Sequence, residues 1–441
     1  MIRRIRELSK NEFVRNVFTL MSATSVAQGI AILIYLVLAK IYTTSEHGIF
    51  ALYLSIIAVT GIMATGKYES AVMMPGDDKS AFDLVSLGSI LTIFFSLLLL
   101  ILVALFHESF ALLLGDPMIE KWLWFVPLST LMIGLFQSFS YWANRNKRFG
   151  NMAVANVGQS LTNSAIKVST SKVFTGGGGL VVGSILGQFI GLALFVWDFL
   201  RKDARKIRDV SLSGMLEMAK EYKFFPRFNM VHSLINNFSG NLPIFVFASR
   251  FGVGEAGLYS FGFMMIFRPV NLVTSSFTQV FSQRIISNYN QGRRIYSDVS
   301  RLVIKLFQFG VLPFLIVGIA GPFIFNLFFG ETWIEAGKYM RILIPWIFMV
   351  LVSSPLSFLP DMLKRQRMAM WLDVLKIALR IPALAIGVYY NNIYLAIVLF
   401  SLVSTLTVGY NLYWYLYLAK NADINRKVKV DESVELPERI D

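Results

Sequence analysis

Three charged residues lie within an apolar stretch that is long enough to cross a bilayer. At about 1.5 Å of rise per residue, residues 369–389 span a hydrocarbon core of about 30 Å, yet they contain Asp373, Lys376 and Arg380. At about 100° per residue, these side chains share one helix face. A charge at this depth costs about 2.5–3.5 kcal/mol on insertion scales, so the face should look into a bundle or a water-filled cavity. Because one carboxylate cannot neutralise two cations, an anionic ligand is favoured. A buried ion network that fixes the helix to its neighbours is the alternative.

Polar residues recur at helical spacing in two further apolar stretches. In residues 151–171 they are Asn156, Gln159, Asn163 and Lys167. In residues 225–248 they are His232, Asn236, Asn237 and Asn241, with Arg227 near the start. Such side chains either line a polar path or join neighbouring helices at about 0.6–2 kcal/mol per contact. Both interpretations remain open, although His232 alone is more typical of a packing histidine than of a proton relay.

Two other places combine charge with apolar sequence. Arg268 lies near the middle of residues 257–281 and is followed by Pro269. Proline frees a backbone carbonyl and allows a kink, so this is a plausible moving point. Lys67 and Glu69 follow the apolar residues 49–66. They could form a surface salt bridge or act in a gate.

The composition indicates a polytopic membrane protein. Apolar residues are 55% of the chain and charged residues 15%, whereas soluble domains carry about 25% charged residues. The net charge of +14 then reflects loops that set topology rather than nucleic-acid binding. With no cysteine and three scattered histidines, thiolate chemistry, a metal site or a cofactor is not expected.

Twelve membrane spans are predicted, and their loops set the orientation. The spans are residues 17–39, 49–66, 84–106, 122–142, 151–171, 177–199, 225–248, 257–281, 302–329, 342–359, 369–389 and 393–418. Most of the 41 basic residues fall in one set of alternate loops and in the termini. The opposite loops hold only Lys40, Lys121, Lys172, Arg250, Lys338 and Arg341. By the positive-inside rule, both termini are predicted to be cytoplasmic.

The longest inward connector, residues 200–224, is predicted to form an interfacial helix. Leu212, Met215 and Leu216 have helical spacing, with Lys220 and Lys223 nearby, as in helices that lie on a membrane surface. A soluble linker helix is the alternative. No glycine-rich phosphate loop or nucleophile elbow is recognisable, and the outward loops are short. An enzyme is therefore not expected.

Two pairs of similar segments suggest an internal repeat. Residues 46–50 and 255–259 both read Glu-x-Gly-apolar-aromatic, and residues 148–153 resemble residues 364–369. We therefore predict an N-lobe over residues 1–205 with six spans. A C-lobe over residues 206–441 would hold the interfacial helix, six spans and the tail. Six spans per half make the repeats parallel, with a site between them at mid-depth.

Residues 40–52, 64–75, 143–149 and 255–259 together resemble the polysaccharide-biosynthesis flippases. These are the Wzx-type O-antigen and exopolysaccharide transporters of the multidrug/oligosaccharidyl-lipid/polysaccharide superfamily. The resemblance implies a two-lobed all-α fold of twelve to fourteen helices with alternating access. It also implies transfer of undecaprenyl-pyrophosphate-linked oligosaccharide from the cytoplasmic to the outer leaflet of the bacterial inner membrane. Membrane lipids, a polysaccharide polymerase and other assembly proteins would be partners of a monomeric chain.

The resemblance also gives the polar residues expected roles. Cations for the pyrophosphate would be Arg268, Arg380, Lys376, Lys167 and Arg227. The glycan would meet Asn156, Gln159, Asn163, His232, Asn236, Asn237 and Asn241. A gate or ion network would use Asp373, Lys67 and Glu69. Gln28 and the asparagines of the seventh span stand where many multidrug members have acidic residues. A cation-coupled exporter, or less readily a membrane polymerase or glycosyltransferase, remains the alternative.

Overall fold

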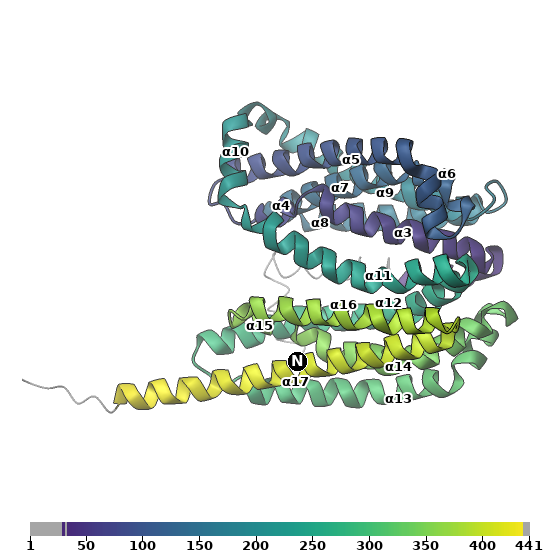
Figure 1. Ribbon diagram of the computed structural model, residues 1–441. Coiled ribbons are helices and arrows are strands. Elements are labelled where there is room, and N and C mark those ends of the chain that lie inside the picture. Colours follow the sequence, from purple (N-terminus) through teal and green to yellow (C-terminus); the bar gives the residue numbers. More distant parts are fainter. Residues whose placement is uncertain (1–28, 31–32, 435–441) are drawn as a thin grey trace, which may run out of the picture. The chain divides into compact units, whose positions relative to one another are not determined.

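The computed structural model describes residues 29–30 and 33–434, with side-chain surroundings as far as residue 424. Most of the predicted first span, residues 17–39, lies outside the described residues, and Gln28 lies outside them entirely. Residues 33–41 form a helix. Each later predicted span corresponds to one long helix (Figure 1). These helices are α3 (Thr44–Ala64), α5 (Asp78–Leu114), α7 (Val126–Arg145), α8 (Phe149–Ser169), α9 (Gly178–Lys202), α11 (Val231–Phe251), α12 (Val253–Asn290), α13 (Tyr296–Phe329), α14 (Ile334–Ser353), α16 (Gln366–Tyr389) and α17 (Ile393–Val434).

The hydropathy of these helices separates apolar spans from polar ones. Within the described residues, seven helices are long and apolar enough to cross a membrane. An eighth is obtained when residues Pro117–Leu123 are joined to α7 across a bend of 48°. The long helices that fall short are α8, α11 and α16. They hold the polar stripes and the charged trio, so the residues that lower their hydropathy are the predicted site residues.

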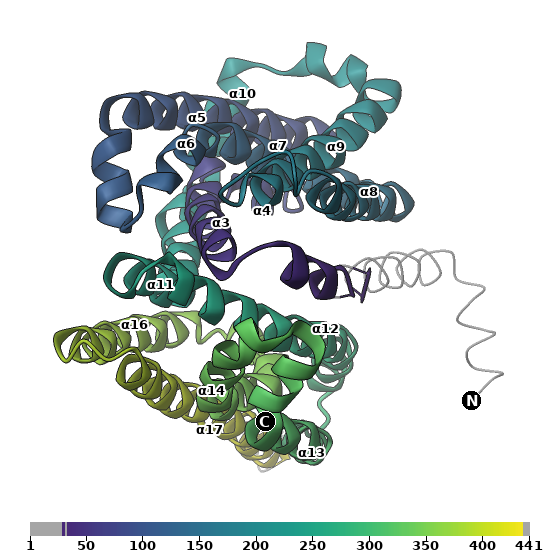
Figure 2. The ribbon, with the colours of Figure 1, turned by 90° about the vertical axis from the view of Figure 1, so that its right-hand side faces the viewer.

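The chain divides into two compact units, Met1–Ser260 and Phe261–Asp441, which we call unit 1 and unit 2. In unit 1, α7 packs against α5 and α9, α8 packs against α9, and α11 packs against α3. In unit 2, α14 packs against α13 and α17, and α16 packs against α17 (Figure 2). The paired helices α8–α9 and α16–α17 are the fifth and sixth spans of the two sequence halves. The lobe boundary predicted between residues 205 and 206 was placed by the sequence repeat, whereas the two units are defined by contacts. That lobe boundary stays a prediction.

A reciprocal contact joins the two copies of the Glu-x-Gly motif inside unit 1. A Cβ added at Gly48 would overlap the carbonyl oxygen of Val253, and one added at Gly257 would overlap that of Thr44. Thr44 and Val253 hold matching places in the repeat, as do Gly48 and Gly257. The contact therefore has the form expected at a twofold axis, where each partner meets the same surface of the other. Glycine at both positions lets the starts of α3 and α12 approach backbone to backbone.

The first turn of α3 is fixed by a capping box. Thr43 accepts a hydrogen bond from the backbone N–H of Glu46, and the Glu46 carboxylate accepts one from the N–H of Thr43 over 2.9 Å. The same carboxylate accepts the N–H of Gly177 over 3.1 Å. A capping box satisfies backbone donors that would otherwise have no partner. Glu46 therefore also ties the turn before α9 to the start of α3.

Each unit contains an apolar cluster at the end where the basic loops lie. In unit 1 the cluster includes Tyr68, Phe82, Trp142, Phe199 and Met218. In unit 2 it includes Ile285, Leu302, Leu306, Val352 and Leu359. Buried rings pack inside the first cluster, where Phe82 and Phe199 are stacked with centroids 5.3 Å apart. The helices of each unit are thus packed together at the end that carries the basic loops.

The inward connector contains the helix α10 (Leu212–Glu221), which lies across the end of α5 (Figure 1). Ser211 caps it by accepting from the N–H of Gly214, and Asp83 of α5 accepts the N–H of Ser211 over 3.4 Å. Met215 and Met218 are buried, whereas the side chain of Leu216 is 53% exposed. One face of α10 is therefore used inside unit 1 and another apolar face is open. The predicted contact of that open face with lipid stays a prediction.

The lipid contact of α10 can be tested because the chain contains no cysteine. A polarity-sensitive fluorophore on Leu216→Cys should emit at shorter wavelength in bilayers, and lipids with quenchers on their chains should dim it. The reason is that Leu216 shares the apolar flank of the helix with Leu212. Glu217 lies about 100° further round the helix axis, on the acidic flank with Glu221. Glu217→Cys is the matched control. Equal emission and quenching at the two positions would favour the soluble linker helix.

Candidate functional site

The charged trio of α16 lies against two other helices of unit 2. Lys376 Nζ lies 2.6 Å from Asp373 Oδ1, and both side chains are 14% exposed. Arg380 is 3% exposed, and its Nε donates to Ser404 Oγ of α17 over 2.9 Å. Lys376 thus pairs with the Asp373 carboxylate, whereas Arg380 is enclosed by protein.

Aromatic rings surround the buried guanidinium. The Cζ atom of Arg380 lies 4.7 Å from the ring centroid of Phe400 and 5.1 Å from that of Trp346. A cation over aromatic faces gains about 2 kcal/mol or more when it is desolvated. For Arg380 this enclosure agrees with the alternative of a buried network that fixes one helix to its neighbours. A role toward a substrate stays a prediction.

The polar stripe of α8 lies against a row of glycines on α9. A Cβ at Gly187 would lie 2.8 Å from Asn163 Cβ, and one at Gly191 would lie 3.0 Å from Gln159 Oε1. Small residues at spacings of four let membrane helices approach closely, and polar side chains then join them. The contacts of Gln159 and Asn163 therefore favour helix joining over a polar path. Asn156 is half-buried.

Lys167, at the end of the same stripe, is 5% exposed. Its Nζ lies 4.2 Å from the ring centroid of Phe50 and 6.0 Å from that of Tyr35. Burial and the nearby Glu46 carboxylate raise the pKa of Tyr42 to about 12. The Tyr42 hydroxyl therefore stays protonated and donates to the carbonyl oxygen of Lys167 over 2.6 Å. Each unit thus encloses one cation of its fifth-span helix among aromatic rings.

The polar stripe of α11 is linked by hydrogen bonds along the helix and to α3. His232 Nε2 and Asn236 Nδ2 lie 3.3 Å apart. Asn241 Nδ2 donates to Asn237 Oδ1 over 3.0 Å, and Ser55 Oγ of α3 donates to Asn241 Oδ1 over 2.9 Å. The four stripe residues are half-buried. Asn241 therefore joins two helices, while the amides nearer the start of α11 remain partly accessible.

The remaining predicted residues belong to other segments of the chain. Arg268 is half-buried in α12 beside the exposed Pro269, and Arg227 is exposed in a π-helical turn, Phe225–Met230. Lys67 Nζ lies 3.4 Å from Glu69 Oε1, and Glu69 is 1% exposed. The predicted salt bridge is present, but its carboxylate is buried rather than on the surface, because the residues around Glu69 fold into a short helix, Tyr68–Ala71, against α5 and α7.

An ion network at the basic end of unit 1 was not anticipated from the sequence. Arg148 lies 3.1 Å from Asp198 and 2.6 Å from Asp203, and Lys206 lies 2.7 Å from Asp78. It ties the start of the inward connector to α5, α8 and α9. The aromatic partners of the buried cations and the α9 glycines were also missed. Only the glycine spacing of Gly183, Gly187 and Gly191 could have been read beforehand.

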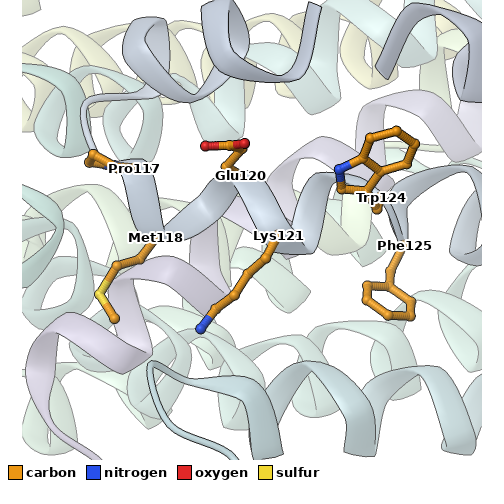
Figure 3. Close-up of a pocket in the computed structure, with 6 residues that line it drawn as sticks. All are labelled: Pro117, Met118, Glu120, Lys121, Trp124 and Phe125. Atoms are coloured by element: carbon orange, nitrogen blue, oxygen red, sulfur yellow. The ribbon is translucent and has the colours of Figure 1, made fainter. Parts of the chain in front are cut away.

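An open hollow of about 630 Å³ lies along the short helices before α7 (Figure 3). Figure 3 shows Met118 and Lys121 on one side of the chain and Glu120 on the other, where Glu120 pairs with His107 over 2.9 Å. No predicted site residue lines this hollow. Among the described residues, no group of three or more His, Cys, Asp or Glu could hold a metal ion.

Comparisons with known proteins agree on the fold. A family model described as polysaccharide biosynthesis protein matches residues 37–338. The structure is similar to that of the lipid II flippase MurJ in an inward closed conformation, with a TM-score of 0.65, 15% identity and coverage of 94% of this chain and 93% of that one. A transporter of the MOP superfamily from Pyrococcus furiosus gives a TM-score of 0.63 at 13% identity, with 93% and 96% covered.

A multidrug resistance MATE family transporter of the same superfamily, in an inward-facing conformation, gives a TM-score of 0.62 at 13% identity, with 91% and 95% covered. No curated protein matches the sequence. The TM-scores over more than 90% of each chain show a shared fold, which is the all-α, two-lobed, twelve-helix architecture that was predicted. The prediction of a multi-pass membrane protein is confirmed with it.

Proposed function

The chain belongs to the polysaccharide biosynthesis protein family, and we propose from this premise that it is a flippase for lipid-linked oligosaccharides. It would move undecaprenyl-pyrophosphate-linked repeat units from the cytoplasmic to the outer leaflet of the bacterial inner membrane by alternating access. The product would serve O-antigen or exopolysaccharide assembly. Both termini would be cytoplasmic, and a monomer would work beside a polysaccharide polymerase and other assembly proteins.

The observation that carries this proposal is a pair of partly accessible cations inside two long helices, Lys376 of α16 and Arg268 of α12. A pyrophosphate is recognised by charge-assisted hydrogen bonds from Lys and Arg side chains, and cations inside membrane helices mark substrate pathways. Lys376 keeps 14% of its side chain exposed, and Arg268 is half-buried. We assign phosphate binding to these two, and assign Arg380 and Lys167 to positioning because protein encloses them. The half-buried amides of Asn236 and Asn237 would contact the glycan.

A cation-coupled exporter is the second candidate, because the fold is shared with a multidrug resistance transporter. A cationic drug would be repelled by Lys376 and Arg268, which would bind an anionic headgroup instead. A polymerase or glycosyltransferase is disfavoured, since the solved structures that share this fold are transporters and flippases.

Flipping can be measured with purified protein in liposomes that carry a fluorescent undecaprenyl-pyrophosphate-linked glycan. We expect Lys376→Gln and Arg268→Gln to lower the initial rate at least about tenfold, since each removes a charge-assisted contact worth about 1.5–3 kcal/mol. Lys305→Gln is the matched control, because Lys305 is an exposed lysine of α13 outside the assigned residues. Dye export that depends on an ion gradient, without movement of the labelled glycan, would support the exporter.

A further inference from the structure

A hollow of about 420 Å³ lies in unit 2, at the end opposite the basic loops. It is lined by Gly318 of α13, Lys338, Arg341 and Ile342 of α14, and Tyr394 of α17. Here α13 ends and both α14 and α17 begin, so the positive-inside rule assigns this end to the outer side. The outward loops hold few basic residues, and two of them, Lys338 and Arg341, meet in this hollow.

The charges of the hollow do not cancel. Lys338 Nζ lies 2.9 Å from Glu335, and the same carboxylate accepts the hydroxyl of Tyr394. Arg341 Nε donates to the carbonyl oxygen of Gly318 over 3.1 Å. Within the described part of the chain, no carboxylate lies within ion-pair distance of Arg341. The Glu335 carboxylate therefore pairs with Lys338 alone among the described cations, and the Arg341 guanidinium is held in place by a neutral carbonyl group.

The surroundings of Arg341 are those of a lipid-facing surface. It lies two helical turns, or about 10 Å, inside the start of α14. On the neighbouring α13, the side chains of Leu315, Ile319 and Phe323 are 55%, 75% and 66% exposed. An exposed guanidinium beside apolar surface at this depth is costly unless an anion accompanies it. The planar guanidinium also matches the oxygens of a phosphate.

We infer that this hollow binds the phosphate group of a lipid in the outer leaflet. The phosphate accepts hydrogen bonds from Arg341 and Lys338, and the lipid chain lies along the exposed residues of α13. Two lipids offer this chemistry, an anionic phospholipid and the polyprenyl carrier of the glycan. Only the second source rests on the proposed function, for which the hollow is a receiving site on the product side.

Lipid binding to the purified full chain, measured by native mass spectrometry in detergent, tests the inference. The probes are phosphatidylglycerol and undecaprenyl phosphate. Arg341→Gln combined with Lys338→Gln should weaken binding about tenfold, since charge-assisted contacts to phosphate are lost. Lys121→Gln is the matched control, because it removes another exposed outward lysine that lies in the separate hollow of Figure 3. Arg341→Lys, which keeps the charge, should bind more weakly than the unaltered chain but better than the double variant.

The two probes separate the sources. Weaker binding of both lipids supports a general lipid-phosphate site, and weaker binding of undecaprenyl phosphate alone assigns the hollow to the glycan carrier. Unchanged binding of both, in variants with unaltered melting temperature, overturns the inference, as does an equal loss with Lys121→Gln. If the double variant has a lowered melting temperature, lipid binding by Lys338→Gln alone is measured instead, and the same outcomes support or overturn the inference. The assay contains no transport step, so a chain that binds lipid here but flips no glycan would refute only the proposed function.

Discussion

Gly48→Ala should lower the stability of the protein by about 1–3 kcal/mol or more, as overpacking of a close contact does. The added methyl group would overlap the carbonyl oxygen of Val253. A backbone atom cannot rotate away as a side chain can, so the starts of α3 and α12 would have to separate. The melting temperature of the purified protein and its amount in the membrane are the measurements.

Gly254→Ala is the matched control for this prediction. Gly254 lies in the same turn of α12 as Val253, but a Cβ there would lie 3.4 Å from Ser45 Oγ and 3.6 Å from Thr44 Oγ1, which are ordinary contacts. Alanine favours a helix by up to about 1 kcal/mol over glycine, so Gly254→Ala should be neutral or stabilising. Equal effects of Gly48→Ala and Gly254→Ala would refute the reciprocal contact between the starts of α3 and α12.

The same reciprocal contact predicts how the stability effects of two substitutions combine. Gly257→Ala should destabilise as much as Gly48→Ala, because its methyl group would overlap the carbonyl oxygen of Thr44 in the matching way. Substitutions that share partners are not additive. Once the first has forced the helices apart, the second should add much less than its own effect.

Arg380→Met should lower glycan flipping at least about tenfold per folded molecule, while costing only about 1–3 kcal/mol of stability. Methionine fills much of the space between Phe400 and Trp346 but removes the buried positive charge that we assign to positioning α16 and its Lys376. The flipping rate in liposomes and the melting temperature are measured on the same preparation.

Ser404→Ala separates charge from local packing at this position. It removes the hydrogen bond that Arg380 Nε donates over 2.9 Å but leaves the guanidinium between its aromatic rings. If the charge matters for transport, Ser404→Ala should retain most of the flipping rate and Arg380→Lys should recover part of it. A loss of flipping that simply follows stability in all three variants would make Arg380 a packing residue of unit 2.

The sequence by itself determined the helices and the faces on which their polar residues lie. Periodicity over about 20 apolar residues requires membrane helices, because every backbone group must be satisfied within the bilayer. The spacing of Asp373, Lys376 and Arg380 required one face, and the Lys376–Asp373 pair follows from it. The repeated Glu-x-Gly motif was also read directly, since each copy is a local segment. The capping box at Thr43 and Glu46 was not predicted, although it too depends only on residues close together in the chain.

The tertiary structure alone decided what covers each face. The α8 stripe meets the glycines of α9, Arg380 lies between Trp346 and Phe400, and the Glu69 carboxylate is buried. Helical spacing tells which residues share a face, but the pairing of helices distant in sequence decides whether that face meets protein, lipid or substrate. For the same reason, the contact between Gly48 and Gly257 could be located only once α3 and α12 were seen to cross.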